Sequence, residues 1–381
     1  MPNTPDYSAR QARLAAALVE QQLDAMLLNP GPSLFYLTGL NFHLMERPVT
    51  ALFTPTAEPV IVLPELETAK LDGLPYALQP VTYGEDPAGW PQAFARAGQL
   101  AGLQTPLATQ RGPQVAVEPT RLRYLELRYL EQALPKAAFV PGDDALSALR
   151  LCKDAAEAAA MRRAVAIAQQ ALLATLPVVK AGVTERQIAA ELTLQLLRAG
   201  SDSEMPFAPI VSGGPNSANP HASPGDRPLQ PGDLLVIDWG AASGGYVSDL
   251  TRTFGIGAVD DECRKIAEIV LAANTAGRAA GRPGVPAEAV DRAARQVIEA
   301  AGYGQYFTHR TGHGIGMEGH EPPYMRSGNT QLLKPGMAYT VEPGIYLTGR
   351  NGVRIEDDML VTEDGVETLS DLPRELRIIE G

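Results

Sequence analysis

Two stretches of the sequence share one pattern: Pro231-Gly-Asp-Leu-Leu-Val-Ile-Asp238-Trp-Gly240 and Pro335-Gly-Met-Ala-Tyr-Thr-Val-Glu342-Pro-Gly344. Each begins with a Pro-Gly turn, continues as a short apolar strand and ends in a carboxylate. Each is followed by a second acid in the next strand-like run, Asp249 after the first stretch and Glu356 after the second. Two related hairpins that supply four carboxylates indicate a site built between them.

The repeat extends beyond these two stretches. Lys180-Ala-Gly-Val matches Arg282-Pro-Gly-Val at an offset of 102 residues (180 to 282), and the Pro-Gly strands repeat at an offset of 104 (231 to 335). Helical patterns of equal length come before both, over 161–179 and 263–281. The sequence therefore predicts an α+β region of two halves related by a pseudo-twofold axis. We expect its strands to form a shared antiparallel sheet, with helices on one face and the acids on the other.

The first part of the chain has a different pattern. Helices are expected over 7–22, 90–103 and 121–133, among strand-like runs at 25–28, 34–37, 51–53, 60–63 and 137–140. This mixture predicts an α/β domain over residues 1–148 and a second domain over residues 149–381. The first domain has one histidine, His43, and no cluster of acids with histidines, so we expect it to shape a pocket or an oligomer contact.

Composition places the chain among ordinary globular proteins. It has 381 residues, of which 45% are hydrophobic and 20% charged. The net charge of −12 argues against a nucleic-acid or anionic membrane surface. The N-terminal residues lack the pattern of a secretory signal, and no apolar run reaches the ~20 residues of a membrane helix. The two cysteines, Cys152 and Cys263, lack CxxC spacing and are expected to be reduced thiols in a cytoplasmic protein.

Both hairpins are expected to bring their acids together. Closing the first hairpin between Ser243 and Gly244 places Asp238 directly opposite Asp249, and the longer loop over 346–351 lets Glu342 and Glu356 pair in the same way. Carboxylates this close raise a pKa unless a cation lies between them. The acids of each hairpin are therefore candidate metal ligands.

His313, in Thr311-Gly-His-Gly-Ile-Gly, adds one imidazole to the four carboxylates. A mainly oxygen ligand set with one nitrogen suits Mn²⁺, Mg²⁺, Fe²⁺ or Co²⁺. Four carboxylates are typical of two metals roughly 3.5–4 Å apart, which activate water for hydrolysis of a carbonyl compound. The run 314–319 also satisfies GxGxxG, but it follows no clear strand and histidines flank it, so we interpret it as a loop of the metal site and not of a nucleotide site.

The motifs that carry this chemistry resemble the pita-bread metallopeptidase family. They are Asp238-Trp-Gly, Tyr246-Val-Ser-Asp249-Leu-Thr-Arg-Thr, Thr311-Gly-His-Gly-Ile-Gly-Met-Glu-Gly-His320-Glu, Thr340-Val-Glu-Pro-Gly-Ile-Tyr346 and Gly352-Val-Arg-Ile-Glu-Asp357. The family includes proline dipeptidases (prolidases), aminopeptidase P and methionine aminopeptidase. The resemblance spans about residues 150–365, and the residues before it resemble the creatinase-type N-terminal domain of the proline-specific members.

The resemblance implies a ligand set for two divalent ions, with Mn²⁺ expected first and Co²⁺, Zn²⁺ or Fe²⁺ as alternatives. Asp238 would bind one ion, Asp249 and Glu356 would bridge both, and His313 and Glu342 would bind the other. Glu342 would also accept a proton from the attacking water.

The resemblance also implies substrate contacts. His221 and His320 would lie on either side of the scissile bond, and Arg354 would orient the bridging carboxylate or bind a substrate carboxylate. Arg310 and Arg350 are further candidates for the substrate carboxylate.

The expected function is hydrolysis of Xaa-Pro dipeptides by a cytoplasmic prolidase, which the resemblance suggests is a homodimer. The alternatives are aminopeptidase P, acting on longer Xaa-Pro peptides, and a non-catalytic relative that binds other molecules. The complete ligand set argues against the last of these and against a metal-free creatinase-like hydrolase.

Overall fold

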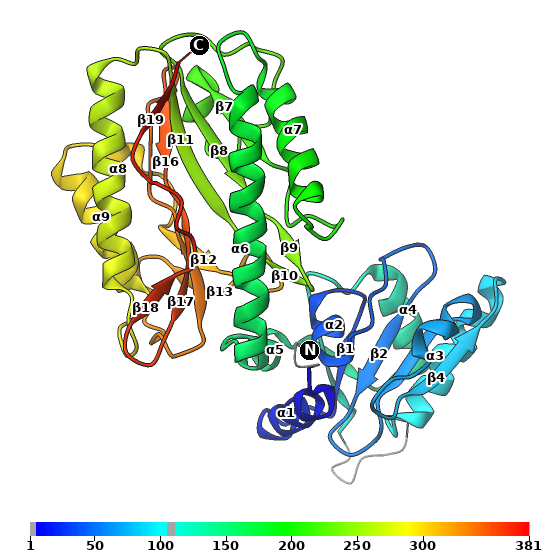
Figure 1. The fold of residues 1–381 in the computed structure, drawn as a ribbon. Coiled ribbons are helices and arrows are strands. Elements are labelled where there is room, and N and C mark those ends of the chain that lie inside the picture. The colour runs from blue at the N-terminus through cyan, green and yellow to red at the C-terminus, as the bar shows by residue number, and fades with distance from the viewer. Residues whose placement is uncertain (1–4, 105–110, 381) are drawn as a thin grey trace. The chain divides into compact units, whose positions relative to one another are not determined.

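The computed structural model describes residues 5–104 and 111–380. Over this range the chain forms two compact units, of which the first ends at Arg150 and the second begins at Leu151 (Figure 1). The expectation about a secretory signal falls partly on residues 1–4, outside the described range. Within that range, no helix combines the length and apolar character needed to cross a membrane.

The first unit is built on a six-stranded sheet. Its strands are β1 (Ala25–Leu28), β2 (Thr50–Phe53), β3 (Val60–Pro64), β4 (Gln79–Tyr83), β5 (Gln114–Val117) and β6 (Ala138–Pro141). They lie in the order β4-β3-β2-β1-β5-β6, with β1, β5 and β6 parallel and β2 antiparallel to both of its neighbours. This mixed sheet confirms the expected α/β architecture, although β4 and β5 were not among the predicted strands.

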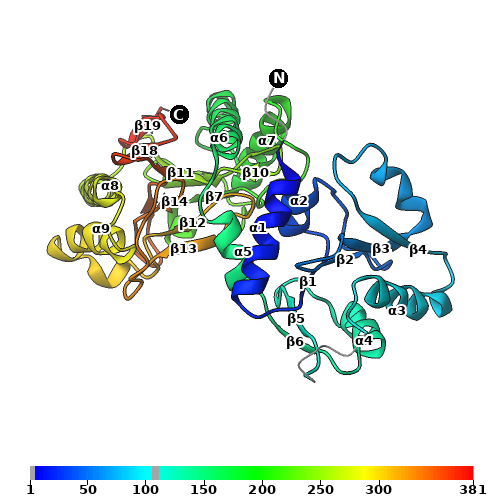
Figure 2. The same cartoon turned by 90° about the horizontal axis from the view of Figure 1, so that it is seen from below.

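Helices cover both faces of this sheet. They are α1 (Tyr7–Glu20), α2 (Pro32–Thr38), α3 (Trp90–Leu100), α4 (Tyr124–Ala133) and α5 (Asp143–Arg150), with short 3₁₀ turns η1 (Glu65–Leu71) and η2 (Pro87–Gly89). Alternate strand residues, such as Ala25 and Leu27 of β1, share one core with α3 and α4. Helices α1, α2 and α5 lie on the other side of the sheet (Figure 2).

One predicted strand of this unit is wrong. Residues 34–37 lie in helix α2 and not in a strand. Pro32 occupies the first turn of the helix, where its fixed φ is already helical, and Gly39 ends the helix in the left-handed conformation with φ of 72°. A four-residue apolar run has no periodicity that separates a strand from a short buried helix, so the flanking Pro and Gly decide the structure.

The second unit repeats one pair of helices. The first pair is α6 (Ala155–Thr175) and α7 (Glu185–Arg198), and the second is α8 (Asp261–Ala280) and α9 (Glu288–Ala300). Within each pair the helices pack against each other (Figures 1 and 2). Both long helices begin after an aspartate N-cap, Asp154 or Asp260, whose side chain accepts backbone N–H groups of the first turn. The pairs confirm the predicted pseudo-twofold repeat.

The strands of this unit form two main sheets. One has the order β19-β11-β8-β7 and the other β13-β12-β14-β17-β18, with small hairpins β9–β10 and β15–β16. Their bounds are β7 (Ile210–Gly213), β8 (Leu234–Trp239), β9 (Ala242–Ser243), β10 (Tyr246–Val247), β11 (Leu250–Ile256), β12 (Gly312–Gly314), β13 (Glu321–Met325), β14 (Ala338–Val341), β15 (Gly344–Tyr346), β16 (Gly352–Arg354), β17 (Asp357–Val361), β18 (Val366–Thr368) and β19 (Arg377–Ile379).

The single shared antiparallel sheet predicted from the sequence is therefore wrong in detail. Each half keeps its own sheet, and β19 runs parallel to β11. An antiparallel bridge between Thr251 and Glu356 links the two sheets, and the Glu356 N–H donates to the Thr251 carbonyl there over 3.1 Å. One of the predicted metal ligands, Glu356, thus lies where the two halves are joined.

Alternation along β8 separates the core from the site. Leu235, Ile237 and Trp239 belong to the core that α6 and α7 cover, and the Trp239 indole N–H donates to the Ala168 carbonyl of α6 over 2.8 Å. Asp238 therefore points to the opposite face. This confirms that the helices cover one face and that the acid lies on the other.

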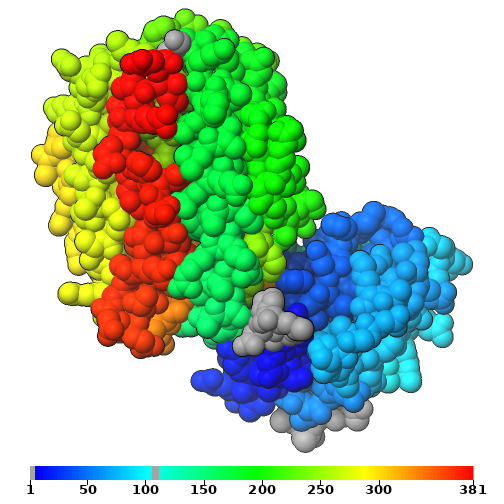
Figure 3. Space-filling view, in the orientation of Figure 1, coloured from blue at the N-terminus to red at the C-terminus, as the bar shows by residue number. Residues whose placement is uncertain are grey.

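The C-terminal segment closes the surface between the two helix pairs. It runs between α6 and α8 (red in Figure 3). Backbone N–H groups of Asp371 and Leu372 donate to the Gln169 side chain of α6, and Arg162 of the same helix pairs with Glu367 of β18. The end of the chain thus links the first half to the second.

Candidate metal centre

The first hairpin positions Asp238 and Asp249 on one face, in a register that differs from the prediction. Asp238 pairs with Thr251, and Ser243 pairs with Tyr246 across a turn formed by Gly244 and Gly245. Both glycines have positive φ, 60° and 80°, which a two-residue hairpin turn of this hand requires. The predicted centre, between Ser243 and Gly244, is one residue too early. Asp238 and Asp249 are consequently diagonal neighbours, although the period of two keeps them on the same face.

The second hairpin has the register expected from the sequence. Val341 pairs with Asp357, and Gly344 pairs with Arg354. Both pairings place Glu342 opposite Glu356 across the loop over 346–351. The acids of the second hairpin therefore lie directly across from each other, as predicted.

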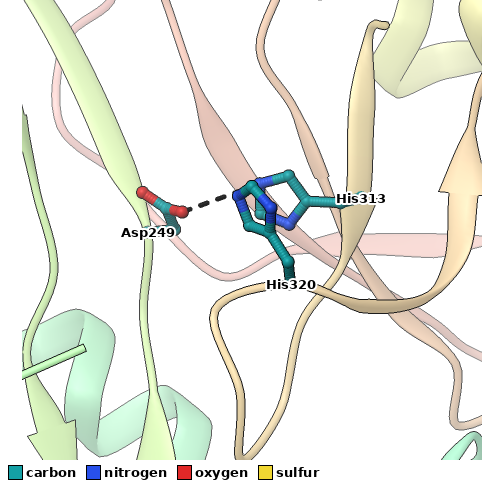
Figure 4. A group of neighbouring side chains, drawn as sticks. All are labelled: Asp249, His313 and His320. Carbon is teal, nitrogen blue, oxygen red and sulfur yellow. Dashed lines mark ion pairs between the residues drawn. The ribbon is translucent and has the colours of Figure 1, made fainter. Parts of the chain in front are cut away.

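Three overlapping groups of ligand atoms result, each with all its atoms within 4.8 Å of one another. One group contains Asp238, Asp249 and Glu356, and a second contains His313, Glu342 and Glu356. Asp249 also approaches His313, at 3.7 Å from its Oδ2 to Nε2. Glu356 thus belongs to both the first and the second group. Asp249 belongs to the first group and also approaches His313 of the second. A third group joins Asp249, His313 and His320, whose stacked imidazoles are visible in Figure 4.

Hydrogen bonding determines which nitrogen of His313 faces the carboxylates. Its Nδ1 lies 3.1 Å from the Gly314 carbonyl, which only accepts, so Nδ1 carries the proton. Its Nε2 then presents a lone pair 3.4 Å from Oε1 of Glu342. A lone pair facing a carboxylate is repulsive unless a cation or a proton lies between them. This is the tautomer that a metal-binding histidine needs.

The centre is strongly buried for a cluster of ionisable groups. The exposed fractions are 8% for Asp238, 6% for Asp249, 2% for His313 and 1% for Glu356. Burial, with the neighbouring carboxylates, raises the pKa of Asp249 and of Glu356 well above the usual range, and burial raises the pKa of Glu342 to about 8. Burial also lowers the pKa of His313 well below its usual value. The protein alone therefore favours protonated, uncharged carboxyls and a neutral imidazole. The neutral imidazole is the form that binds a metal, whereas the carboxyls bind a metal only after they lose their protons.

Two buried oxygens in the cluster lack a hydrogen-bond partner among the described residues: Oδ1 of Asp238 and Oε1 of Glu356. Their sister oxygens are both satisfied, because Asp238 Oδ2 accepts from Arg354 and Glu356 Oε2 accepts from the Thr251 hydroxyl over 2.7 Å. A buried, unsatisfied oxygen costs about 1–3 kcal/mol. The unpartnered oxygens, the carboxylate-rich donor set and the deprotonated Nε2 of His313 together fit two divalent cations.

Arg354 supports the centre from one side. Its Nη2 donates to Asp238 over 2.5 Å, and its Nε donates to the Thr251 hydroxyl over 3.2 Å, which in turn donates to Glu356. The sequence placed Arg354 beside Glu356, whereas the structure brings it into direct contact with Asp238. Arg354 as a whole is 3% exposed.

Sequence reasoning gave no role to His309 and Tyr346, which form a chain of hydrogen bonds behind Arg354. Arg354 Nη1 lies 3.0 Å from the Tyr346 hydroxyl, and that hydroxyl lies 2.8 Å from Nε2 of His309. His309 Nδ1 lies 2.7 Å from the Arg310 carbonyl and must be the protonated nitrogen. Each donor therefore has one direction: Arg354 to Tyr346, Tyr346 to His309, and His309 to the Arg310 carbonyl. The only sequence signal for this chain was the proximity of His309 to His313.

The predicted site residues line one cavity of about 680 Å³ within the second unit. They are Asp238, Asp249, His313, Glu342, Glu356, His221, His320 and Arg354. Pro206, Phe207 and Ile210 give one part of the wall an apolar surface, and Arg310 contributes a further cation. Arg350 lies elsewhere, because it pairs with Glu262 and Asp260 at the surface.

Close packing in this centre explains two glycines of the run 314–319, Gly314 and Gly316, whereas a Cβ on Gly319 would meet nothing within 4 Å. A Cβ on Gly314 would lie 2.2 Å from the Pro322 carbonyl oxygen, and one on Gly316 would lie 2.6 Å from Oε1 of Glu321. Gly314 lies at the end of β12, which pairs with β13 and β14. Gly314 and Gly316 therefore permit close approach of neighbouring chain segments beside His313.

Comparison with known proteins identifies the family. Residues 159–363 match the model of metallopeptidase family M24, and residues 10–152 match that of the creatinase/prolidase N-terminal domain. The chain belongs to metallopeptidase family M24. It is therefore a hydrolase with the pita-bread fold, as the sequence motifs indicated.

Similar proteins match nearly the whole length of this chain. A probable dipeptidase PepE of Mycobacterium tuberculosis is 40% identical over 380 residues, which cover 98% of this chain and 96% of that protein. A prolidase from Thermococcus sibiricus is 32% identical, with a TM-score of 0.91 and coverage of 99% and 100%. An X-Pro aminopeptidase from Thermotoga maritima is 29% identical, with a TM-score of 0.82 and coverage of 97% and 99%. The same fold thus occurs in proteins named for both peptidase activities.

Proposed function

We propose that this M24 metallopeptidase is an Xaa-Pro dipeptidase that works with two divalent ions, within a catalytic domain over residues 149–381. The observation that carries this proposal is the buried group of four carboxylates and one imidazole, in which Asp238 and Glu356 each have an unpartnered oxygen. Asp238, Asp249, His313, Glu342 and Glu356 would hold the ions. When bound, the ions would activate water and polarise the substrate carbonyl.

The protein groups around the ions have separate tasks in this proposal. Glu342 accepts the proton of the attacking water, because it lies at the wall of the cavity with a side chain that is 16% exposed. His221 and His320 line the same cavity and contact the substrate beside the scissile bond. His320 has a pKa lowered by burial, with the charges of Arg310 and His221 adding to the effect. It therefore acts as a neutral hydrogen-bond donor at neutral pH.

The lining of the cavity suits a dipeptide that carries a proline ring and a free carboxylate. Its apolar wall of Pro206, Phe207 and Ile210 suits a proline ring, and Arg310 lines the same space. A free carboxylate after proline would find a cation there. The relatives named as dipeptidases and prolidases support this choice. The second candidate, aminopeptidase P activity, rests on the similarity to the Thermotoga maritima protein.

We further propose Mn²⁺ as the native ion, with Co²⁺, Zn²⁺ or Fe²⁺ as alternatives, because carboxylate oxygens dominate the ligand set. The free thiols of Cys152 and Cys263 support a cytoplasmic location. A homodimer completes the proposal and rests on family resemblance.

Hydrolysis of Ala-Pro and Ala-Pro-Ala by the metal-depleted protein, before and after addition of Mn²⁺, tests the function. We expect Mn²⁺ to restore cleavage of Ala-Pro and to leave Ala-Pro-Ala nearly uncut. Efficient release of alanine from the tripeptide would favour the aminopeptidase alternative. Failure to cleave either peptide would contradict the proposal.

Two substitutions at the centre sharpen this test. Glu342→Gln and Asp249→Asn remove one carboxylate each and should abolish turnover. Asp226→Asn is the matched control, because Asp226 is exposed and pairs with Arg186 outside the cavity. Turnover retained in either centre variant would refute the assigned site.

A further inference from the structure

The loop that carries His221 has little regular structure of its own. It runs from Gly213, at the end of β7, to Gly225, and beyond the 3₁₀ turn η4 (Gly214–Ala218) it contains no helix or strand. Among the described residues, no group forms a hydrogen bond with the imidazole of His221, which is exposed. Contacts elsewhere in the loop must therefore hold this imidazole at the cavity that it lines.

Glu185 ties the two ends of this loop together. It is the first residue of α7 and is 1% exposed. Its Oε1 accepts the Gly213 N–H over 2.7 Å, and its Oε2 accepts the Gly225 N–H over 2.7 Å and the Asn216 side-chain amide over 2.9 Å. Hydrogen bonds to an ionised carboxylate are stronger than those between neutral groups. One buried side chain thus holds both ends and the first turn of the loop.

The hydrogen bonds of Glu185 serve this loop alone. In the part of the chain that the structure describes, no lysine or arginine forms an ion pair with Glu185, and Glu185 does not line the cavity. Arg186, the next residue of α7, forms an exposed ion pair with Asp226, the residue after Gly225. Exposed ion pairs contribute little to stability. The pair of Arg186 with Asp226 therefore offers a control that joins the same two segments.

The second half of the unit contains a corresponding arrangement. Asp291, a buried residue in the first turn of α9, accepts the backbone N–H of Thr311 over 3.0 Å and its hydroxyl over 2.9 Å. Arg295 binds both oxygens of Asp291 and donates to the His309 carbonyl over 2.7 Å. Thr311 comes two residues before His313. In each half, a carboxylate on the second helix of the pair thus holds the segment that brings a histidine to the cavity.

The middle of the His221 loop contacts the second hairpin. The Pro220 carbonyl accepts from Nη1 of Arg354 over 3.3 Å, and the Gly352 N–H donates to the Ser217 hydroxyl over 2.8 Å. These contacts join the loop to β16, whereas Glu185 joins its ends to α7. Without the carboxylate of Glu185, the position of His221 depends mainly on β16.

We propose that Glu185 is a positioning residue, which holds the ends of the loop and thereby places His221 beside the substrate. The inference rests on the proposed Xaa-Pro dipeptidase function, in which His221 contacts the substrate. Among the described residues, Glu185 forms no hydrogen bond or ion pair with a proposed metal ligand. It therefore acts on turnover through the loop. A misplacement of about 1 Å can lower turnover on the order of 100-fold, so a small loosening of the loop is measurable.

A double-mutant cycle tests this role. Cleavage of Ala-Pro is measured with Mn²⁺-loaded wild type, Glu185→Gln, His221→Ala and the double variant. Glutamine keeps the size of Glu185 but replaces one acceptor oxygen by an amide donor. We expect Glu185→Gln to lower kcat/KM by about tenfold or more, mainly through kcat, when His221 is present. In the His221→Ala background the loss should be less than about twofold.

Asp226→Asn is the matched control, because it removes the exposed pair between the same segments. It should lower kcat/KM by less than about twofold, and both Glu185→Gln and Asp226→Asn should bind as much manganese as the wild type. Asn216→Ala removes one of the three donors to Glu185 and should give a smaller loss that also depends on His221. Asn216→Ala replaces Glu185→Gln in the cycle if the latter does not fold.

Three outcomes of the cycle would overturn the inference. Equal losses with and without His221 would mean that Glu185 acts independently of that histidine. Full activity of Glu185→Gln would mean that the loop does not need the carboxylate. A loss of manganese from Glu185→Gln would mean that the substitution acts through the metal centre.

Hydrogen exchange of backbone amides adds a measurement that needs no turnover. We expect faster exchange over residues 213–225 in Glu185→Gln, and unchanged exchange there in Asp226→Asn and over β8 in both. If the wild type does not hydrolyse Ala-Pro with Mn²⁺, the dipeptidase proposal is contradicted whatever the variants do. Exchange then decides the role of Glu185 separately: faster exchange confined to the loop supports it, whereas unchanged exchange overturns it.

Discussion

Arg354 donates a hydrogen bond from Nη2 to Oδ2 of Asp238 over 2.5 Å, and both side chains are buried. The bond joins the second hairpin to the first, because Arg354 ends β16 and Asp238 lies in β8. Because Oδ2 accepts this bond, Oδ1 is the Asp238 oxygen that has no hydrogen-bond partner among the described residues. Arg354 therefore orients a metal ligand.

Arg354→Lys should weaken metal binding. A lysine cannot keep the contacts to Asp238, Thr251 and Tyr346 at once, so Asp238 loses its fixed orientation. We expect the dissociation constant for Mn²⁺ to rise by roughly 10–100-fold, as is common when a supporting partner of a ligand is removed. Competition with a fluorescent chelator measures it. Arg350→Lys, at the surface, is the control. An unchanged affinity in a folded Arg354→Lys protein would show that the contact does not support the site.

The metal-free protein should lose stability as the pH rises from about 6.5 to 8. Glu342 has a folded pKa of about 8 against 4.5 when unfolded, and the pKa values of Asp249 and Glu356 are raised as well. The folded protein thus retains protons that the unfolded chain has lost, and stability falls by about 1.4 kcal/mol per pH unit for each proton retained. The pKa values of His309 and His313 are lowered from 6.5, so both are neutral in both states above that pH.

Urea unfolding at pH 6.5, 7.2 and 8.0, with and without Mn²⁺, measures this effect. Bound cations hold the carboxylates deprotonated, so the metal-loaded protein should have a much smaller slope over the same range. Calorimetric titrations in buffers of different ionisation enthalpy should also detect proton release on metal binding. Metal-free stability that rises over this range would show that the carboxyls are not protonated in the folded state.

Tyr346→Phe should destabilise the protein by about 1–3 kcal/mol, because Arg354 loses an acceptor and His309 loses a donor in a buried chain of hydrogen bonds. Tyr339→Phe is the matched control. The Tyr339 hydroxyl is buried and has no hydrogen-bond partner among the residues described, so its loss should be neutral or stabilising. Chemical denaturation measures both. Equal effects of the two changes would mean that the chain through Tyr346 contributes nothing.

Much of the site could be predicted because the chain repeats itself. The match of Pro231–Gly240 to Pro335–Gly344 located Asp238 and Glu342 at equivalent strand ends, and the structure brings both into one cavity. Alternation along a strand depends only on the period of two, so the face occupied by Asp249 was correct even though its partner was not.

The rest depended on information that short sequence patterns do not contain. The register of the first hairpin depended on which two residues form the turn, and Gly244-Gly245 competed with a centre one residue earlier. The contact of Arg354 with Asp238 joins residues 116 positions apart, and no local pattern reports such a distance. No local pattern reports the separation of the strands into two sheets either, because the bridge between Thr251 and Glu356 joins distant parts of the chain.

The most direct test of the central claim is the metal content of the chain and the positions of the bound ions. Protein loaded with Mn²⁺ and freed of excess ion should contain two ions per chain by elemental analysis. Anomalous scattering from its crystals should place both ions against Asp249 and Glu356. Asp238→Asn and His313→Ala should each reduce the content toward one. A wild-type chain that holds no ion, or a single ion that leaves Asp238 or His313 uninvolved, would contradict the two-metal centre.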